Sequence, residues 1–152
     1  MPTEIFAKIG AIQGESQDAK HKGEIEVLSF SWGVALADAP GPGGGGAGKA
    51  TFQDLSIVHV IDKATPKLLE ACATGQHLKD ATITHRKAGK GHLEFLVFKM
   101  SDVVVTAVTH GGTTDAPATE TVKLAFAKVD FEYRFQRPDG SLDPGIHFKH
   151  TL

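Results

Sequence analysis

Apolar and polar residues alternate with a period of two along most of the chain. The alternating segments are residues 5–12, 24–37, 51–61, 81–87, 93–100, 103–108 and 121–136. Successive side chains of a strand point to opposite faces, so this pattern predicts half-buried β-strands. Ile146 and Phe148 in the tail predict a last edge strand after a segment rich in turn residues.

The segment 24–37 has two chemically different faces. One face carries the large apolar residues Leu28, Phe30, Trp32 and Val34, and the other carries Ile25, Val27, Ser29, Ser31 and Gly33. If Phe30 and Trp32 fill the interior, Ser29, Ser31 and Gly33 point outward. Ordinary solvent exposure accounts for such a face, and so does close approach to another molecule.

Two places predict irregular strands. Ser101 and Asp102 interrupt a long apolar stretch, and the buried phase of residues 121–136 changes near Ala127. The early phase buries Val122, Leu124 and Phe126, and the late phase buries Val129, Phe131, Tyr133 and Phe135. We therefore expect a bulge or a bend at Ser101 and Asp102 and a bulge near Ala127, which would let long strands curl into a barrel.

One helix is predicted, at residues 66–74. Thr65 is the expected N-cap, Pro66 suits the first turn, and Gly75 suits the position after the last turn. Its apolar face comprises Leu68, Leu69 and Cys72. The predicted fold is mainly β: a single-domain (1–152), compact antiparallel β-barrel of two packed sheets with one short helix.

Composition excludes several classes of protein. The chain has 152 residues, of which 41% are hydrophobic and 22% charged, as in ordinary globular domains. A net charge of −2 gives no global field to hold nucleic acid or an anionic membrane. A single cysteine excludes an intrachain disulfide, and no apolar run has the length of a membrane helix. The first residues lack the features of a Sec signal peptide, so export through Sec is not expected.

A glycine-rich loop at residues 38–49 resembles a phosphate-binding loop without completing it. Gly43 to Lys49 fits GxxxxGK, but Ala50 stands where Ser or Thr would hold Mg²⁺, and a strand-like segment follows instead of a helix. The loop is longer than a hairpin needs, so we expect either a plain connection or, preferably, a contact surface. The expected contact residues are Pro42, Gly43, Gly44, Gly45, Gly46, Gly48 and Lys49.

No motif predicts catalysis, a metal or a cofactor. Eight histidines are scattered along the chain, and His147 and His150 lie in the tail without an HExxH or CxxC pattern. Cys72 lies on the apolar helix face, where a buried thiol is ordinary. Arg86, Lys87 and Lys90 are interpreted as a basic cluster on the exposed flank of a hairpin.

Five blocks, in order, resemble Hcp, the haemolysin-coregulated protein family of type VI secretion. They are FAKIGAIQGES (6–16), EIEVLSFSWG (24–33), GGGGAGKATFQDLSIVHVIDKATPKLLEACATGQHL (43–78), ATITHRKAG (81–89) and KVDFEYRFQRPDGS (128–141). Each block alone is a weak signal, but their order and spacing over nearly the whole chain are specific.

The resemblance implies a structural, exported tube subunit rather than an enzyme. Such proteins form six-membered rings that stack into a tube, bind effector proteins inside the ring, and work with a contractile sheath and a spike. The resemblance implies export from the bacterial cytoplasm without Sec, and neither nucleic-acid binding nor membrane insertion. Ser29, Ser31 and Gly33 would then face the hole, and the loop 38–49 would touch the next ring. A free-standing ring-shaped carrier is the first alternative, and a small hydrolase on a similar barrel is the second.

Overall fold

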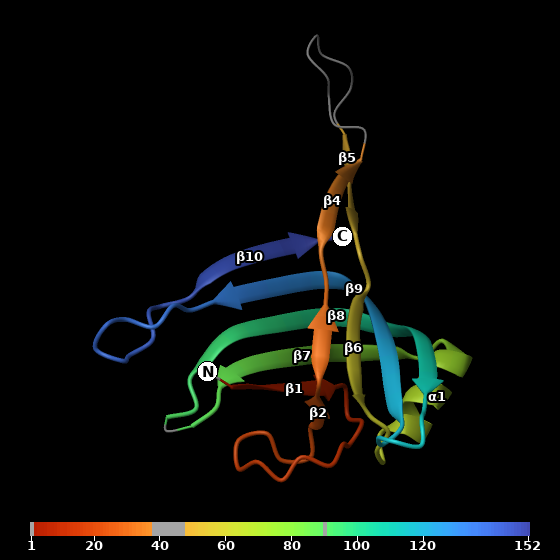
Figure 1. Cartoon of the computed structure of the whole chain (residues 1–152). Helices are drawn as coiled ribbons and strands as arrows, with labels where there is room; N and C mark the ends of the chain where they lie inside the picture. The colour runs from red at the N-terminus through yellow and green to blue at the C-terminus, as the bar shows by residue number, and fades with distance from the viewer. Residues whose placement is uncertain (1, 38–47, 90) are drawn as a thin grey trace.

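The computed structural model describes residues 2–37, 48–89 and 91–152. Its elements are β1 (Thr3–Ile9), β2 (Ile25–Val27), β3 (Ser29–Ser31), β4 (Val34–Ala37), β5 (Lys49–Phe52), β6 (Leu55–Val60), α1 (Thr65–Thr74), β7 (His77–Lys87), β8 (Glu94–Gly111), β9 (Thr119–Tyr133) and β10 (Ile146–Thr151). Strands dominate, as the period-two pattern predicts (Figure 1).

One antiparallel sheet nearly closes into a barrel. Its order is β2-β1-β7-β8-β9-β6-β3, and β10 pairs with β9 beside this path. β2 and β3 pair with β1 and β6, at opposite ends of the order, and only Leu28 separates them. The Leu28 amide donates to the Val58 carbonyl at 2.8 Å, which joins the two ends. The predicted mainly β barrel with one short helix is confirmed.

β8 and β9 run through both layers of the barrel. β1, β7, β10 and the parts of β8 and β9 near residues 94–101 and 128–133 form the first layer. β3, β6 and the remaining parts of β8 and β9 form the second layer. In Figure 1, β6 and the orange strand between β2 and β4 pass in front of β7 and β8, while β8 and β9 bend from one direction into the other.

The bend lies where the sequence predicts irregularity. Buried positions change phase between Met100 and Val103 in β8, and between Phe126 and Val129 in β9. Asp102 has a φ of 53°, a left-handed conformation that non-glycine residues rarely adopt. At Ser101 and Asp102 the predicted bulge or bend is a bend. The phase change at Ala127 is confirmed, but the bulge expected there is wrong. The same register connects Ser101–Lys128 and Val103–Phe126, and the register of β8 against β9 shifts further on, between Val105 and Ala107.

Aliphatic side chains from both layers fill the barrel. Fully buried members include Ile9, Ile25, Leu55, Ile57, Ile83, Met100, Val103, Val122 and Leu124. Tyr133, the last residue of β9, and Phe135, which follows it, were predicted to be buried but are each 44% exposed.

α1 packs on β8 and contributes Ala64, Leu68 and Ala71 to the core. Gly75 ends it with a φ of 64°, and its amide returns to the last turn, as predicted. The prediction of Thr65 as N-cap is wrong, because Ala64 holds that position without a side-chain cap. Leu69 is also 41% exposed, contrary to its predicted place on the buried face.

The predicted strand 24–37 is three strands rather than one. β2 buries Ile25 and Val27, whereas β3 turns Phe30 inward. The change of phase falls on Leu28, which is 60% exposed, so its predicted face is wrong. The prediction that Ile25 and Val27 share a face with Ser29 is wrong for the same reason, since both are buried and Ser29 is exposed. β4 leaves the barrel and pairs with β5 as a separate hairpin, which stands away from the barrel in Figure 1. The predicted strand 51–61 is likewise divided between β5 and β6.

Candidate functional site: the exposed faces and the hairpin

The outer side of the second layer is lined by small side chains. Cross-strand pairs place Ser29 opposite Val58, Val58 opposite Thr121, and Thr121 opposite Thr109. In the next row Ser31 lies opposite Ser56, and Ser56 opposite Lys123. We call this surface the hydroxyl face: Ser29, Ser31, Ser56, Val58, Thr109, Thr121 and Lys123. Six of its seven residues are uncharged serine, threonine or valine, and Lys123 is the one charged member. The face therefore consists mostly of small side chains and carries little charge.

Aromatic packing on the inner side fixes this orientation. Phe30 meets the Phe98 ring at 5.5 Å between centroids, and Trp32 meets the same ring at 5.5 Å. Since β-strand side chains alternate, Ser29 and Ser31 point outward, and both are exposed as predicted. Gly33 is half-buried, and the Gln53 backbone amide donates to its carbonyl at 3.0 Å. Ser56, Thr109 and Thr121 join the face only through strand pairing, which the linear sequence does not give.

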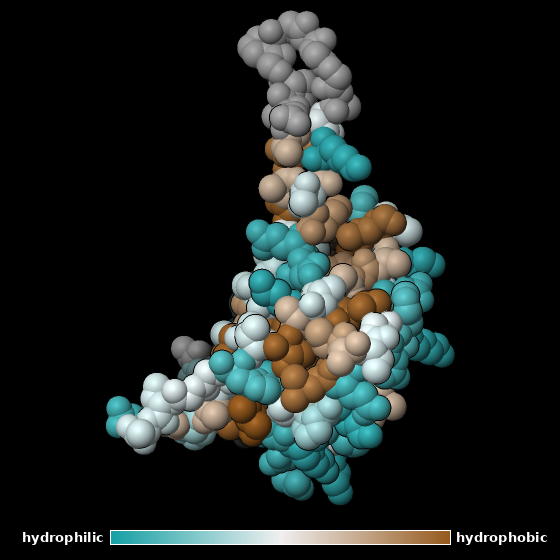
Figure 2. Space-filling view, turned by 90° about the vertical axis from the view of Figure 1, so that its right-hand side faces the viewer, coloured by the Kyte–Doolittle hydropathy of each residue, from teal (hydrophilic) through white to brown (hydrophobic). Residues whose placement is uncertain are grey.

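The β4–β5 hairpin presents apolar side chains that the rest of the barrel does not cover. Val34 is 51% exposed and Leu36 is 56% exposed. Figure 2 shows the hairpin as a narrow column whose lower part carries hydrophobic residues. Of the predicted contact loop, Pro42, Gly43, Gly44, Gly45 and Gly46 lie outside the described residues. Gly48 is half-buried, and Lys49 is exposed on β5 opposite Ala37.

A hollow of about 330 Å³ adjoins the junction of β2 and β3. Leu28, Val60 and Ile61 form its apolar part, with exposed fractions of 60%, 39% and 38%. Glu15, Glu26 and Asp62 form an acidic rim, and desolvation raises the pKa of Asp62. The hollow lies at the start of β3. Within the described residues β3 pairs with β6 on one side and has no strand on its other side.

The interpretation of Arg86 as a surface cation is wrong. Arg86 is 1% exposed and donates from Nε to Glu4 Oε1 at 3.1 Å and from Nη1 to Asp18 Oδ2 at 3.0 Å. Its guanidinium carbon lies 4.7 Å from the centroid of the Phe6 ring. The Arg86 hydrogen bonds hold the pKa of Asp18 well below its usual range, and Asp18 in turn raises the pKa of Arg86. Lys87 is half-buried, and Lys90 lies outside the described residues.

A second buried polar cluster joins β6, β8 and β9 to the start of α1. Glu120 is fully buried and accepts contacts from His59 Nε2 at 2.7 Å and His110 Nε2 at 2.6 Å. The Thr65 hydroxyl donates to the same carboxylate at 3.2 Å. Within the described residues, no group of three His, Cys, Asp or Glu side chains is arranged to hold a metal ion. Through these contacts Glu120 of β9 joins β6, β8 and the first residue of α1.

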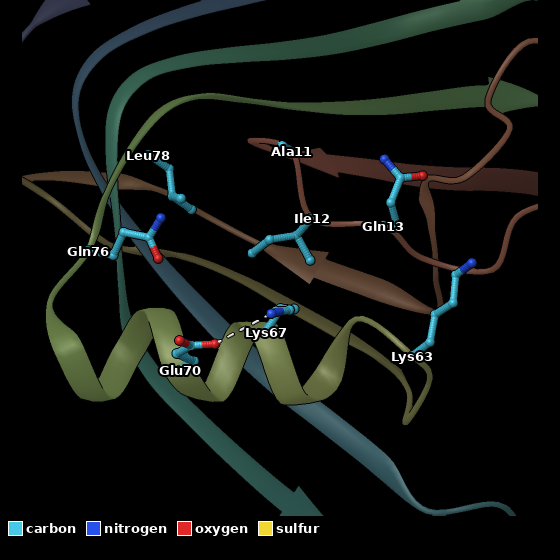
Figure 3. Close-up of a pocket in the computed structure, with 8 residues that line it drawn as sticks. All are labelled: Ala11, Ile12, Gln13, Lys63, Lys67, Glu70, Gln76 and Leu78. Atoms are coloured by element: carbon cyan, nitrogen blue, oxygen red, sulfur yellow. Dashed lines mark ion pairs between the residues drawn. The ribbon is translucent and has the colours of Figure 1, made fainter.

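A further hollow, of about 600 Å³, lies between α1 and the turn after β1 (Figure 3). On the side of the hollow that α1 forms, Lys67 Nζ lies 3.7 Å from Glu70 Oε2. The lining residues are Ala11, Ile12, Gln13, Lys63, Lys67, Glu70, Gln76 and Leu78. None is a serine, cysteine or histidine, the residues that usually form a nucleophile and its base. Cys72 is half-buried and free, elsewhere on α1.

Comparison with known proteins identifies the family. A family profile described as "Type VI secretion system effector, Hcp" matches residues 6–133. Protein hcp1 of Pseudomonas aeruginosa is 45% identical over 148 residues, which cover 95% of this chain and 91% of that protein. The chain belongs to the Hcp family.

Solved structures of other Hcp proteins have the same fold. Hcp1 from Salmonella typhimurium has a TM-score of 0.80 at 35% identity, covering 99% of this chain and 95% of its own. A type VI secretion system effector from Yersinia pestis has a TM-score of 0.80 at 33% identity, with coverage of 97% and 99%. The resemblance of the five sequence blocks is thus confirmed, and the chain is a type VI secretion protein. No helix in the described ranges is both long and apolar enough to cross a membrane.

Proposed function

We propose that this Hcp protein is a structural subunit of a homohexameric ring, that the rings stack into the tube of a type VI secretion system, and that effector proteins bind in the ring. In this proposal the protein is not an enzyme and needs no cofactor. It passes from the bacterial cytoplasm to the outside within the secretion machine, and the sheath and spike are its other partners.

The exposed β4–β5 hairpin is the observation that carries the proposal. Val34 and Leu36 keep about half of their surface in solvent. Exposed apolar surface does not stabilise an isolated subunit, but it stabilises a contact that buries it. A protruding hairpin with apolar sides suits insertion against a neighbouring copy. Leu28, Val60 and Ile61 offer a second apolar surface, at a different place on the barrel. Two different surfaces on one subunit are what head-to-tail closure and stacking require.

The hydroxyl face supports a place for cargo. In a ring of barrels, the outer side of one of the two layers lines the hole. The hydroxyl face, on the second layer, has smaller side chains and less charge than the outer side of the first layer. Such a lining would let a protein pass without sticking. Weak contacts repeated around the ring would add up through multivalency.

Native mass spectrometry at micromolar concentration tests the ring directly. We expect a hexamer as the main species, and negative-stain images should show rings of uniform diameter with a central hole. A spectrum that contains only monomer would contradict the proposal. Rings that never stack at high concentration, yet still bind cargo, would favour the free-standing carrier over the tube subunit. Turnover in a panel of ester, peptide and glycan substrates would favour the hydrolase.

A further inference from the structure

The interior of the barrel ends in an ionisable cluster near the start of α1. Glu120 shares a side of β9 with Val122, and His59 shares a side of β6 with Ile57; all four side chains are fully buried. Because strand side chains alternate, both polar groups point into the barrel rather than onto either outer side. A buried group changes its charge only where neighbouring groups compensate for the lost water.

The contacts of Glu120 indicate where His59 carries its proton. Glu120 Oε1 lies 2.7 Å from His59 Nε2 and accepts from the Thr65 hydroxyl at 3.2 Å, and Oε2 lies 2.6 Å from His110 Nε2. A carboxylate only accepts hydrogen bonds, so each Nε2 carries a hydrogen. His59 Nδ1 is buried and has no hydrogen-bond partner within the described residues. In a neutral imidazole this atom is a bare acceptor, and it is where a second proton would bind.

Asp62 lies beside that bare nitrogen. Its Oδ2 is 3.7 Å from His59 Nδ1, just beyond hydrogen-bond distance, and its side chain is 12% exposed. Burial raises the pKa of Asp62, while the Ala64 amide, which donates to Oδ1 at 2.8 Å, lowers it in part. A cation at His59 would compensate for the buried negative charge. The other titratable groups around this pair are Glu15 after β1, Glu26 of β2, Lys63 of the same turn, His110 of β8 and Glu120 of β9.

We propose that His59 is a proton switch: in mild acid its imidazole binds a second proton at Nδ1, and Asp62 closes onto the new N–H. The proton comes from solvent and bonds to the Nδ1 lone pair, and no bond of the chain breaks. The moving part is the turn between β6 and α1. The Asp62 amide donates to the Thr65 hydroxyl at 3.2 Å, so closing the gap moves the start of α1 against the barrel end.

The switch also changes the charge of the hollow at the junction of β2 and β3. Asp62 belongs to the acidic rim of that hollow, beside Leu28, Val60 and Ile61. Pairing Asp62 with an imidazolium makes the rim less negative, which lowers the cost of covering its apolar part. One consequence rests on the proposed function: if the hollow is a contact between subunits, association should strengthen as the pH falls from about 8 to about 6, where histidine gains its charge.

An NMR titration between about pH 8.5 and about pH 5.5 tests the switch in the whole protein. The His59 ring signals are assigned with His59→Gln, whose amide can still donate to Glu120. We expect the His59 ring and the backbone amides of residues 62–65 to titrate with one shared midpoint. The ring of His77, exposed at the start of β7, should titrate without moving those amides. A His59 ring that keeps one charge state over this range would overturn the proposal, as would a His59 titration that leaves residues 62–65 in place.

Asp62→Asn removes the charge of the partner, while its Oδ1 can still accept from the Ala64 amide. This variant should lose the shared titration of residues 62–65, and Asp80→Asn, at an exposed aspartate of β7, should keep it. Coupled shifts that survive in Asp62→Asn would contradict the switch.

Sedimentation at the two pH values supplies a separate readout of assembly. Association should be stronger at the lower pH in the wild type and in Asp80→Asn, and should lose this dependence in Asp62→Asn. A ring whose association does not change with pH would rule out the hollow as the surface that the switch controls. If no ring forms at either pH, the proposed function fails, and the NMR titration still decides whether His59 is a switch.

Discussion

Arg86 shows how one buried cation holds a long irregular segment. Its partners Asp18 and Glu4 are 68 and 82 residues away in the chain. His21, which stacks on Phe6 at 4.5 Å between centroids, lies in the same segment and contacts Glu94 at 2.7 Å. These contacts attach the segment between β1 and β2 to the first layer. Two adjacent basic residues in a sequence suggest a solvated surface, and nothing local to Arg86 indicates its distant carboxylates.

Asp18→Asn should lower the free energy of unfolding at neutral pH, because the carboxylate that Arg86 binds is lost. The pKa of Asp18 is depressed in the folded protein, so its contribution is present above the ordinary value of about 3.9 and is lost as the pH falls through the folded value. Denaturant unfolding across pH should therefore show a wild-type advantage that is constant above about pH 5 and shrinks below about pH 4. An advantage that stays constant down to pH 2 would contradict this assignment.

Ser31→Arg should place one bulky charge per subunit in the hole of the ring. Because Ser31 is exposed, the free energy of unfolding should change by less than about 0.5 kcal/mol. We expect cargo capture to fall sharply in pull-down measurements, while native mass spectrometry shows the ring intact.

Ser101→Arg is the matched control, since Ser101 is an exposed serine of β8 in the other layer of the barrel. It should leave cargo capture unchanged. Normal capture by Ser31→Arg would show that this residue does not line the working hole. Unfolding of that variant would mean that Ser31 faces the core.

At the scale of elements, the β4–β5 hairpin lies outside the eight-stranded sheet, so we expect it to contribute little to folding and more to assembly. Its strands pair only with each other through Val34–Phe52 to Ala37–Lys49 within the described residues. Its base meets the last strand, where the Phe52 ring lies 4.7 Å from the His150 ring and 6.4 Å from the Phe148 ring. The hairpin is thus anchored at one end and exposed along its length.

A double variant with Val34→Ser and Leu36→Ser should fold normally and assemble poorly. The free energy of unfolding of the isolated subunit should change by no more than about 0.5 kcal/mol, because both side chains are exposed. Tube formation, measured by sedimentation and negative stain, should decrease strongly. Leu69→Ser, at a residue 41% exposed on α1, is the control. Tubes that form as readily as those of the wild type would make the hairpin a mere connection.

Periodicity predicted most strands because one face of each is buried. It located the phase change at Ala127 but not its mechanism, since a left-handed residue such as Asp102 leaves no reliable mark in a sequence. Leu28 was misplaced for a related reason. A single residue between two short strands reverses which positions are buried. The apolar-polar alternation of the sequence continues across that residue and does not reveal the reversal. α1 was predicted to within one residue at its start, although the identity of its cap was not.

At the scale of the whole molecule, strand pairing creates what the linear sequence could not predict. Ser29 and Ser31 were predicted from the chemistry of one segment, but Thr109 and Thr121 join them only because β6 lies between β3 and β9. A closed sheet with bent strands thus gives the barrel two outer sides, whose residues come together only in the folded chain.

Trp32 is the only tryptophan in the chain, and it stands where the barrel and the hairpin meet. Its indole lies 5.5 Å from the Phe98 ring, 6.4 Å from the Phe131 ring and 6.1 Å from the Phe52 ring, measured between centroids. The first two rings belong to the interior, and the third belongs to β5. The protein therefore carries its single tryptophan, which can be excited selectively over Tyr133, at this junction. Its emission reports the docking of β3 in one subunit, and a shift on stacking would register movement of the hairpin without any attached dye.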